Sequence, residues 1–543
     1  MNGFPILSVI LFLPLLGAVG ALVLPRTAGW IWALAAALAD LVLALVLLTQ
    51  FSLAASGFQF AERAPWLPGF GINYALGVDG VSVFLLALNA LLTAVALGAS
   101  WGVVRSGDRS REYLALMLLL STGMQGVFLA TNLFLFYVFW ELMLVPAYFL
   151  VGMFGGPRRA YAAIKFVLYT AAGSLLMLVG IIALGALVSQ NARQPFDLDL
   201  ATLIQRGAAS LPAGTQIWLF LAFFAAFAVK SGLFPLHSWV PDTYGEAPVP
   251  VVVLIAGVMA KTGTYGFIRF NLTLFPQASR ELTGLMSALA VAGILYFALQ
   301  ALVAQDFKRL LAYVSISHMS VIILGAFALN TQGIEGGILQ MVNHGIIIAA
   351  LFLIAGFIER RTGSRRLADF GGLATRLPWL ATAFLIAALS ALGLPGLNSF
   401  AGEFLAFLGA FQANVIFGVL GTLVVIPAAW YMLRFFQGVM AGPPSELVET
   451  AGAASDGPAR ARRTRARGLA DLRGGELAVL LPLLVLIVAL GVAPGALTAR
   501  MESSVRPLTL TPAAITSTSG SSPAWPDVAA ARHLGAISIA GPR

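Results

Sequence analysis

Residues 219–235 read Leu-Phe-Leu-Ala-Phe-Phe-Ala-Ala-Phe-Ala-Val-Lys-Ser-Gly-Leu-Phe-Pro, an apolar run that ends in a lysine and a helix-breaking sequence. Proline lacks a backbone donor and its ring clashes with the preceding turn, so we expect the helix that carries Lys230 to break before Pro235. Broken backbone at membrane depth is tolerated only where it is buried in protein or lines a wet cavity. The stretch therefore predicts an interrupted membrane helix with a lysine at its break.

A second interruption is expected in the apolar segment 377–411, which runs into Gly393-Leu-Pro-Gly396 and carries Glu403 just beyond it. A membrane helix needs about 20 apolar residues, and this criterion gives fourteen candidates, of which the seventh and the twelfth are interrupted. The candidates lie at approximately 4–25, 29–50, 78–102, 112–130, 132–153, 160–188, 215–233, 249–275, 282–304, 308–329, 335–359, 377–411, 413–439 and 476–498.

The composition of the 543 residues supports an all-α polytopic membrane protein. Hydrophobic residues make up 59% and charged residues only 10%, whereas soluble domains carry roughly 25% charged residues. The apolar runs are continuous and do not alternate, which excludes a membrane β-barrel. The chain has no cysteine, so disulfides, cysteine-ligated iron–sulfur clusters and thiol nucleophiles are excluded as well.

The net charge of +9 lies mostly in short loops, which indicates membrane orientation and no nucleic-acid partner. Arginine and lysine concentrate in the loops after odd-numbered helices. The positive-inside rule therefore predicts that both termini lie outside a bacterial-type inner membrane. The first apolar run, 4–25, is expected to be a membrane helix, because it is too long for the core of a cleavable signal sequence and no basic residues precede it.

The two interruptions fall at similar places in two blocks of five helices, so the second block is predicted to have inverted topology. Paired interruptions of this kind indicate a transporter site. The predicted segments are helices 1–3 with an external loop (1–111), a first five-helix repeat (112–276), a second, inverted five-helix repeat (277–440), a cytoplasmic linker (441–475), a final helix (476–499) and a disordered external tail (500–543).

Ionisable residues inside membrane helices are rare and mark functional sites by default. Burial favours the neutral form of a lysine, while a carboxylate about 4 Å away favours the charged form by about 4 kcal/mol at an effective dielectric of about 20. Such opposed effects suit proton transfer. The candidates are Asp40, Glu141, Lys165, Lys230, Lys261, His318, His344 and Glu403.

Structural roles stay open for these residues. A Glu–Lys pair such as Glu141 with Lys230 can be a structural tie, and Lys165, nearer a helix end, can extend its ammonium group to the membrane interface. Asp40 stands alone on an apolar helix and suits a local hydrogen bond. His318 and His344 suit a proton relay, with a hydrogen-bonded core histidine or a shared haem as alternatives.

Four motifs give the chain a family resemblance. They are Lys230-Ser-Gly-Leu-Phe-Pro-Leu-His-Ser-Trp-Val-Pro-Asp242, Glu246-Ala-Pro248, Lys261-Thr-Gly-Thr-Tyr-Gly266 and Asp306-Phe-Lys-Arg-Leu-Leu-Ala-Tyr-Val-Ser-Ile-Ser-His-Met319. In this order they resemble the proton-pumping antiporter-like subunits of respiratory complex I, over roughly residues 55–500. Glu403 stands where chains L and N typically have lysine, so the resemblance is to the chain M branch, also called subunit 4, of NADH:quinone oxidoreductase.

The resemblance implies roles for the buried residues. Glu141 would pair with Lys230, and Lys261 would be the central proton carrier. The two membrane histidines would continue the path to an exit at Glu403, and Lys165 would modulate uptake. The site residues implied for proton translocation are Glu141, Lys230, Lys261, His318, His344, Glu403 and Lys165.

No cofactor or metal is expected in this chain. The resemblance places NADH, FMN, iron–sulfur clusters and quinone in partner subunits, where quinone reduction would drive the protons. Expected partners are the other membrane-arm subunits, especially neighbouring antiporter-like subunits, and the lipid bilayer. Two alternatives stay open: the large subunit of an Mrp-type cation/proton antiporter, and the membrane arm of a ferredoxin- or hydrogenase-linked relative.

Overall fold

The structure, a computed structural model, describes residues 4–53, 55, 57–446, 448 and 469–509. Within these residues, thirteen helical spans are long and apolar enough to cross a membrane. They are α1 (Ile6–Val23), α2 (Arg26–Gln50), α3 (Ser82–Ala99), α5 (Ser110–Leu129), α6 with α7 (Leu133–Leu142, Leu144–Phe154), α8 (Arg159–Ala192), α10 (Ala213–Ser231), the span Val249–Leu274 that contains α12 (Val249–Leu254), α13 (Ala260–Gly266) and α14 (Leu272–Leu274), α16 (Thr283–Val303), α17 (Phe307–Ala326), α18 (Thr331–Thr362), α21 with α22 (Val415–Thr422, Val425–Met440) and α25 (Gly474–Val492).

The remaining predicted helix, residues 377–411, is present as two shorter helices, α19 (Pro378–Ala391) and α20 (Asn398–Ala413). Together with the thirteen spans they account for the predicted helical membrane fold, which is confirmed. Short helices α4 (Trp101–Ser106), α9 (Leu200–Gln205) and α15 (Pro276–Glu281) connect the spans. The division into two inverted five-helix repeats stays a prediction.

Both interruptions begin with a left-handed glycine. α10 ends at Ser231, and Gly232 has φ 70°; after α19, Gly393 has φ 78°. Glycine takes this conformation without a Cβ clash, which lets the chain leave the helix. The first interruption leads into α11 (Trp239–Glu246), and the Trp239 indole donates to the Val229 carbonyl at 2.9 Å. The Val229 carbonyl thus accepts this indole N–H in addition to the backbone N–H of Gly232.

One loop of this helical fold contains a β-hairpin, which the sequence analysis does not predict. In the external loop predicted between the second and third candidate helices, β1 (Gln59–Leu67) pairs antiparallel with β2 (Ile72–Val78). The strands satisfy each other's backbone groups, and the Thr131 N–H donates to the Ala75 carbonyl, which ties the hairpin to the bundle. We call this side of the molecule the hairpin end, and the opposite side, where Arg158, Arg309 and Arg365 gather, the Arg-rich end.

The predicted disordered tail, 500–543, is wrong over its first residues, because α26 (Gly495–Thr509) is helical. Leu497, Met501 and Val505 are buried at a spacing of four residues, so one apolar face packs on the bundle. Residues 510–543 lie outside the described residues, as do 447 and 449–468 of the predicted linker 441–475.

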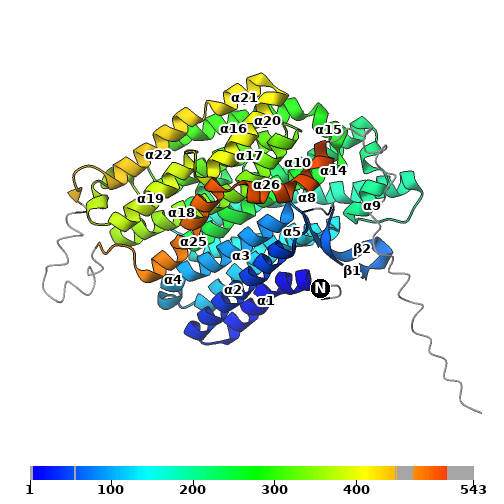
Figure 1. Ribbon diagram of the computed structural model, residues 1–543. Coiled ribbons are helices and arrows are strands. Elements are labelled where there is room, and N and C mark those ends of the chain that lie inside the picture. The colour runs from blue at the N-terminus through cyan, green and yellow to red at the C-terminus, as the bar shows by residue number, and fades with distance from the viewer. Residues whose placement is uncertain (1–3, 54, 56, 447, 449–468, 510–543) are drawn as a thin grey trace, which may run out of the picture.

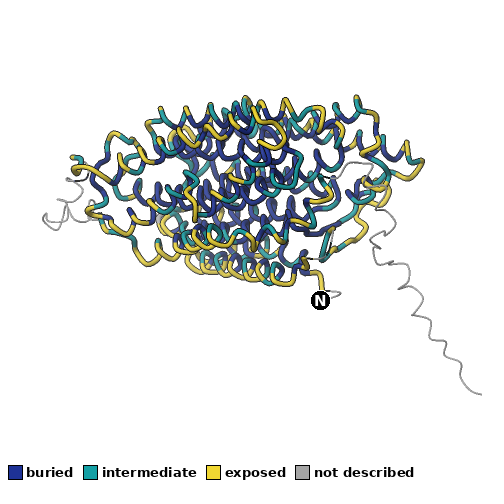
Figure 2. The backbone as a smooth tube through the Cα atoms, turned by 45° about the horizontal axis from the view of Figure 1, so that its top comes forward, coloured by how far each residue is buried: buried dark blue, intermediate teal, exposed yellow. Residues whose placement is uncertain are grey.

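α18 and the span 249–274 form the centre of the bundle. Both are buried along their apolar length, and Figure 2 shows buried backbone in the middle and exposed backbone around it. In Figure 1, α1 and α2 lie along one edge, α21 and α22 along the opposite edge, and α18 runs between them. Lys261 and His344, carried by the two central segments, therefore lie in the protein core.

A buried ion pair fastens α3 to the end of the span 249–274. The Arg269 guanidinium lies 2.6 Å from Asp79 Oδ1, which also accepts the backbone N–H groups of Val81 and Ser82. Burial by itself would raise the pKa of Asp79, but Arg269 and these hydrogen bonds hold the pKa below its ordinary value. The pair therefore stabilises the fold at neutral pH, and its contribution is lost only as the pH falls through this lowered pKa.

We predict that Gly80→Ala displaces α26. A Cβ at Gly80 would overlap the Arg500 carbonyl oxygen, and the Gly80 N–H donates to Ser504 Oγ at 2.9 Å. Because the chain has no cysteine, Met501→Cys is a clean reporter, and the wild-type Met501 is fully buried. Maleimide should label the introduced thiol rapidly only when Gly80→Ala is also present. The control Gly214→Ala, which has open space around its Cβ, should leave labelling slow. Equal labelling rates with Gly80→Ala and with Gly214→Ala would contradict the packing of α26 against Gly80.

Candidate functional site

A polar cluster lies where α20 meets α17 and α18. Glu403 Oε1 lies 2.8 Å from His318 Nδ1 and accepts from Gln340 Nε2 and Ser399 Oγ, each at 3.0 Å. The Gln340 amide also reaches Ser399 Oγ at 2.9 Å. An imidazole and a carboxylate in direct contact can pass a proton between them, so this cluster can hold a proton on either group.

Asparagine side chains hold the break between α19 and α20. Asn343 Nδ2 on α18 donates to the Asn398 carbonyl at 2.6 Å, and Asn398 Nδ2 donates back to the Asn343 carbonyl at 3.4 Å. Ser390 Oγ on α19 donates to Asn398 Oδ1 at 2.7 Å. These contacts tie the first residue of α20 to α18 and to α19. They also fix the start of α20, which brings Ser399 and Glu403 against α18.

The two membrane histidines lie side by side. The ring centroids of His318 and His344 are 5.4 Å apart, with 16° between the ring planes. Neither ring nitrogen of His344 has a hydrogen-bond partner within the described residues. Buried nitrogens of this kind ordinarily take water as a partner. His344 thus offers two proton-accepting or proton-donating atoms in the core.

A metal or haem site is not built here. Nearly parallel rings 5.4 Å apart leave no room for a porphyrin between His318 and His344, so the haem alternative does not fit. Over the ranges that the structure describes, no three histidine, aspartate or glutamate side chains are placed to hold a metal ion.

Lys261 lies between two π-helical segments, Ile255–Met259 and Phe267–Asn271. Its side chain is fully buried, and its Nζ donates to the Ala256 carbonyl at 2.5 Å. π-Helical turns disturb the regular helix ladder and are frequent at functional sites. Among the described residues no carboxylate forms an ion pair with Lys261. Lys261 interacts electrostatically with His344 on α18.

Lys230 contacts aromatic rings instead of a carboxylate. Its Nζ lies 5.1 Å from the Trp140 ring centroid and 5.8 Å from the Phe166 ring centroid. Glu141 follows Trp140 on α6 and acts on Lys230 electrostatically, yet within the described chain the two make no close ion pair. The structure as described shows Lys230 in cation–π contacts and no direct ion pair with Glu141.

The helices that carry the two core lysines are in direct contact. A Cβ at Gly263 would lie 2.6 Å from the Phe227 carbonyl oxygen and 2.9 Å from the Ser231 backbone nitrogen. Only glycine permits such a close approach of α13 to the end of α10. Lys230 and Lys261 are therefore held on neighbouring backbone segments at the first interruption.

Asp242 on α11 joins three cations at the Arg-rich end. Lys165 Nζ lies 2.9 Å from Asp242 Oδ2, Arg309 lies 3.1 Å from Oδ1, and Arg158 lies 4.0 Å from Oδ1. The Lys165 side chain therefore turns toward α11. The carboxylate of Asp242 keeps these three like charges together.

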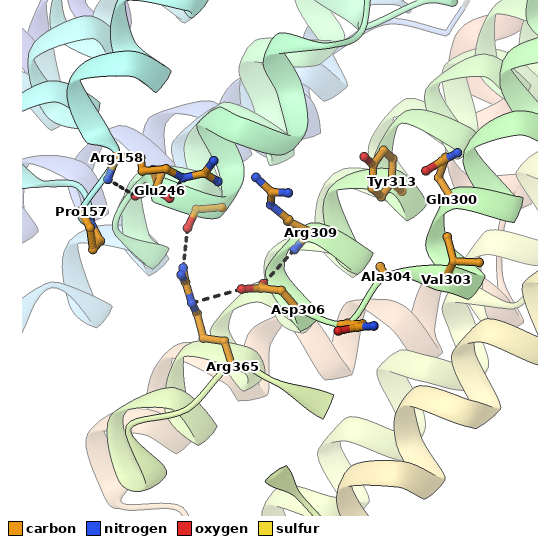
Figure 3. Close-up of a pocket in the computed structure, with 12 residues that line it drawn as sticks. Pro157, Arg158, Glu246, Gln300, Val303, Ala304, Asp306, Arg309, Tyr313 and Arg365 are labelled. Carbon is orange, nitrogen blue, oxygen red and sulfur yellow. Dashed lines mark hydrogen bonds and ion pairs between the residues drawn. The ribbon is translucent and has the colours of Figure 1, made fainter. Parts of the chain in front are cut away.

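A cavity of about 600 Å³ lies beside this cluster. Figure 3 shows Arg365 between the two sides of the cavity, with its guanidinium 3.3 Å from Asp306 Oδ2 and 2.7 Å from the Gly245 carbonyl. Glu246 accepts the Arg158 backbone N–H at 2.9 Å. The polar lining gives water a way to approach α11 from the Arg-rich end.

The sequence analysis missed the amide groups of this site. Gln340, Asn343 and His344 occupy one region of α18, an otherwise apolar helix, and Asn398 and Ser399 begin α20. Polar amides at membrane depth are costly unless they find partners. On α18, Asn343 and His344 follow Gln340 by three and four residues, which places the three side chains on one helix face and is a signal visible in the sequence. It was missed because only charged residues and histidine were taken as candidates.

We predict that Asp242→Asn destabilises the protein, because three cations then lose the charge that neutralises them. Loss of hydrogen bonds to a charged group costs about 1.5–3 kcal/mol, so the thermal transition in detergent should fall clearly. The matched control Asp108→Asn removes an ion pair with Arg26 in which Asp108 is 98% exposed, and it should cost less than about 1 kcal/mol. Equal effects of the two variants would contradict the assigned role of Asp242.

Comparisons with known proteins agree with this geometry. A family model described as NADH:quinone oxidoreductase/Mrp antiporter, transmembrane, matches residues 130–426. NADH-quinone oxidoreductase subunit M of Rhodobacter capsulatus is 38% identical over 511 residues, covering 92% of this chain and 95% of that protein. A chain of respiratory complex I from Thermus thermophilus is 32% identical with a TM-score of 0.80, covering 93% of this chain and all of that one.

A chain of the Mrp complex from Dietzia sp. is 25% identical with a TM-score of 0.77, covering 94% of this chain. The matched region 130–426 contains all seven predicted site residues, from Glu141 to Glu403. The identity to subunit M proteins extends over nearly the whole chain. The chain therefore belongs to the NADH:quinone oxidoreductase/Mrp antiporter family and, within it, to the NADH-quinone oxidoreductase subunit M proteins.

Proposed function

We propose that this chain moves protons across a membrane as a subunit of NADH:quinone oxidoreductase. The observation that carries the proposal is the line of buried titratable groups through an apolar core, together with family membership. Three groups of that line are Lys261, His344 and His318, which succeed one another toward Glu403. Burying such groups in a membrane core costs free energy, so their presence there indicates a function.

The relay runs from an amine through two imidazoles to a carboxylate. Lys261 gives its proton toward His344, whose unpartnered nitrogens take it directly or through water. His344 exchanges it with the neighbouring His318, and His318 Nδ1 passes it to Glu403 Oε1 across 2.8 Å. Each imidazole can accept on one nitrogen and donate from the other, which is what a relay needs.

Glu141 controls how strongly Lys230 holds its proton. In this structure the two interact without a close contact. Movement of Glu141 to about 4 Å from the ammonium group would add about 4 kcal/mol at an effective dielectric of about 20. Transfer of one proton against about 150 mV costs about 3.5 kcal/mol. The two quantities match, so a shift of Glu141 is sufficient in size to load or discharge Lys230.

Protons enter from the Arg-rich end, which the positive-inside rule makes cytoplasmic. The wet cavity leads to Asp242, and Lys165 modulates uptake through its ion pair with that carboxylate. Both termini then lie outside an inner membrane, and α20 carries Glu403 toward the exit. The span 112–276 acts as one five-helix repeat and 277–440 as its inverted counterpart.

The energy arrives from partner subunits. Neighbouring antiporter-like subunits flank the chain in the membrane arm, and NADH, FMN, iron–sulfur clusters and quinone reside in other subunits. A second candidate function is cation/proton exchange in an Mrp-type assembly. It is favoured by the shared family model and by the similarity to the Dietzia sp. Mrp complex.

We predict that Lys230→Ala and Glu141→Ala each abolish most NADH-driven proton pumping in membrane vesicles and slow NADH oxidation, while assembly is retained. Lys230→Ala removes the titrating amine, and Glu141→Ala removes the charge that acts on it. The control Arg434→Ala removes an exposed cation that donates to the Leu302 carbonyl, and pumping should be unchanged.

Loss of assembly in both variants would instead indicate that Glu141 and Lys230 have a structural role. Normal NADH-driven pumping together with lost sodium/proton exchange would favour the Mrp-type function. Either outcome would contradict the proposed control of Lys230 by Glu141.

A further inference from the structure

Asp40 is a buried carboxyl group that the relay does not use. It lies on α2 at the edge of the bundle, where α2 packs against α3 and α5 (Figure 1), and its side chain is fully buried. Among the described residues no lysine, arginine or histidine pairs with it. An isolated carboxylate in such surroundings costs far more free energy than a neutral carboxylic acid.

The only polar contact of Asp40 within the described residues is Gln125 on α5, whose Nε2 donates to Asp40 Oδ2 at 2.5 Å. Each of these groups has one further oxygen atom, Asp40 Oδ1 and Gln125 Oε1. Both atoms are buried and neither has a hydrogen-bond partner in the described part of the chain. A buried polar atom without a partner costs about 1–3 kcal/mol, and here two such atoms belong to the same pair of side chains.

A hydrogen atom on Asp40 Oδ1 that is donated to Gln125 Oε1 would satisfy both oxygens. We propose that Asp40 is a proton-binding site outside the relay, with the carboxyl group held as a neutral acid in a cyclic pair with Gln125. In this pair Gln125 Nε2 donates to Asp40 Oδ2, and the protonated Oδ1 of Asp40 donates to Gln125 Oε1. The bound ligand is a proton, taken up by the carboxylate as an O–H bond, and no other charge changes.

The groups that face this site are neutral. One turn before Gln125, Ser121 Oγ on α5 accepts from Asn89 Nδ2 at 3.1 Å and from Thr93 Oγ1 at 2.9 Å, both on α3. Along α3 and α5, as the structure describes them, no charged side chain acts on Asp40. A single proton therefore neutralises the whole site, and Asp40 exchanges that proton with water only when α2 separates from α5.

A bound metal cation such as sodium is the competing occupant, because it also neutralises a carboxylate. It requires several oxygen ligands around it, whereas the unpartnered oxygens within the described residues number two here, one on each side chain of a pair that is already hydrogen-bonded through Gln125 Nε2 and Asp40 Oδ2. The geometry favours the proton. The two occupants differ in a measurable way, since sodium leaves the carboxyl group ionised.

Infrared spectroscopy of the assembled membrane complex tests the proposal. The chain is labelled with aspartate that carries carbon-13 in its side-chain carboxyl group, and spectra of the wild type and Asp40→Asn are subtracted at neutral pH. An asparagine side chain can make both hydrogen bonds with Gln125, so this variant should fold. We expect the subtraction to show the loss of one protonated-carboxyl band that is independent of sodium.

Loss of a pair of carboxylate bands would overturn the proposal, and a dependence of those bands on sodium would assign a cation instead. The control Asp108→Asn, at a 98% exposed carboxylate, should remove carboxylate bands only. If Asp40→Asn does not assemble, Gln125→Leu gives a second readout. Without its hydrogen bonds, the same labelled band should move to higher frequency, and an unmoved carboxyl spectrum would overturn the proposal.

Discussion

The contact between His318 and Glu403 shows the constraint on which the site depends: a titratable group in an apolar core needs a partner. Each partner must itself be satisfied, so Gln340 and Ser399 join the cluster and the start of α20 is fixed against α18. The same requirement explains the asparagine contacts at the second interruption. Groups that lack such partners, above all the ring nitrogens of His344, are where water and protons are needed.

The interruptions of the helices place chemistry at the middle of the bundle. At the first, the backbone leaves α10 at Gly232, and the close approach at Gly263 brings the helix of Lys261 against that of Lys230. At the second, Asn398 holds the break and Glu403 follows one turn later. Unbroken helices would hydrogen-bond these backbone groups within their own ladders.

Much of this arrangement could be predicted from the sequence, because hydropathy, proline positions and rare membrane charges are local signals. They located the spans and both interruptions, and they single out seven residues as candidates for the site. The docking of α26 could not be predicted, since it depends on a contact with a distant part of the chain. The hairpin β1–β2 and the amides on α18 were missed although their residues were in view, because the partners of these amides lie on other helices. The separation of Glu141 from Lys230 could not be predicted from the sequence either, because it depends on how Trp140 packs against the Lys230 ammonium group in the folded chain.

The central claim is that protons cross the core through Lys261. The direct measurement is the number of protons translocated per NADH oxidised in inverted membrane vesicles that carry Lys261→Met, a variant of similar length without a titrating group. The account predicts assembled, NADH-oxidising complex with a lower ratio than the wild type, since the carrier between the two interruptions is lost. An unchanged ratio at full assembly would contradict the account, because protons would then pass this chain by another route or not at all.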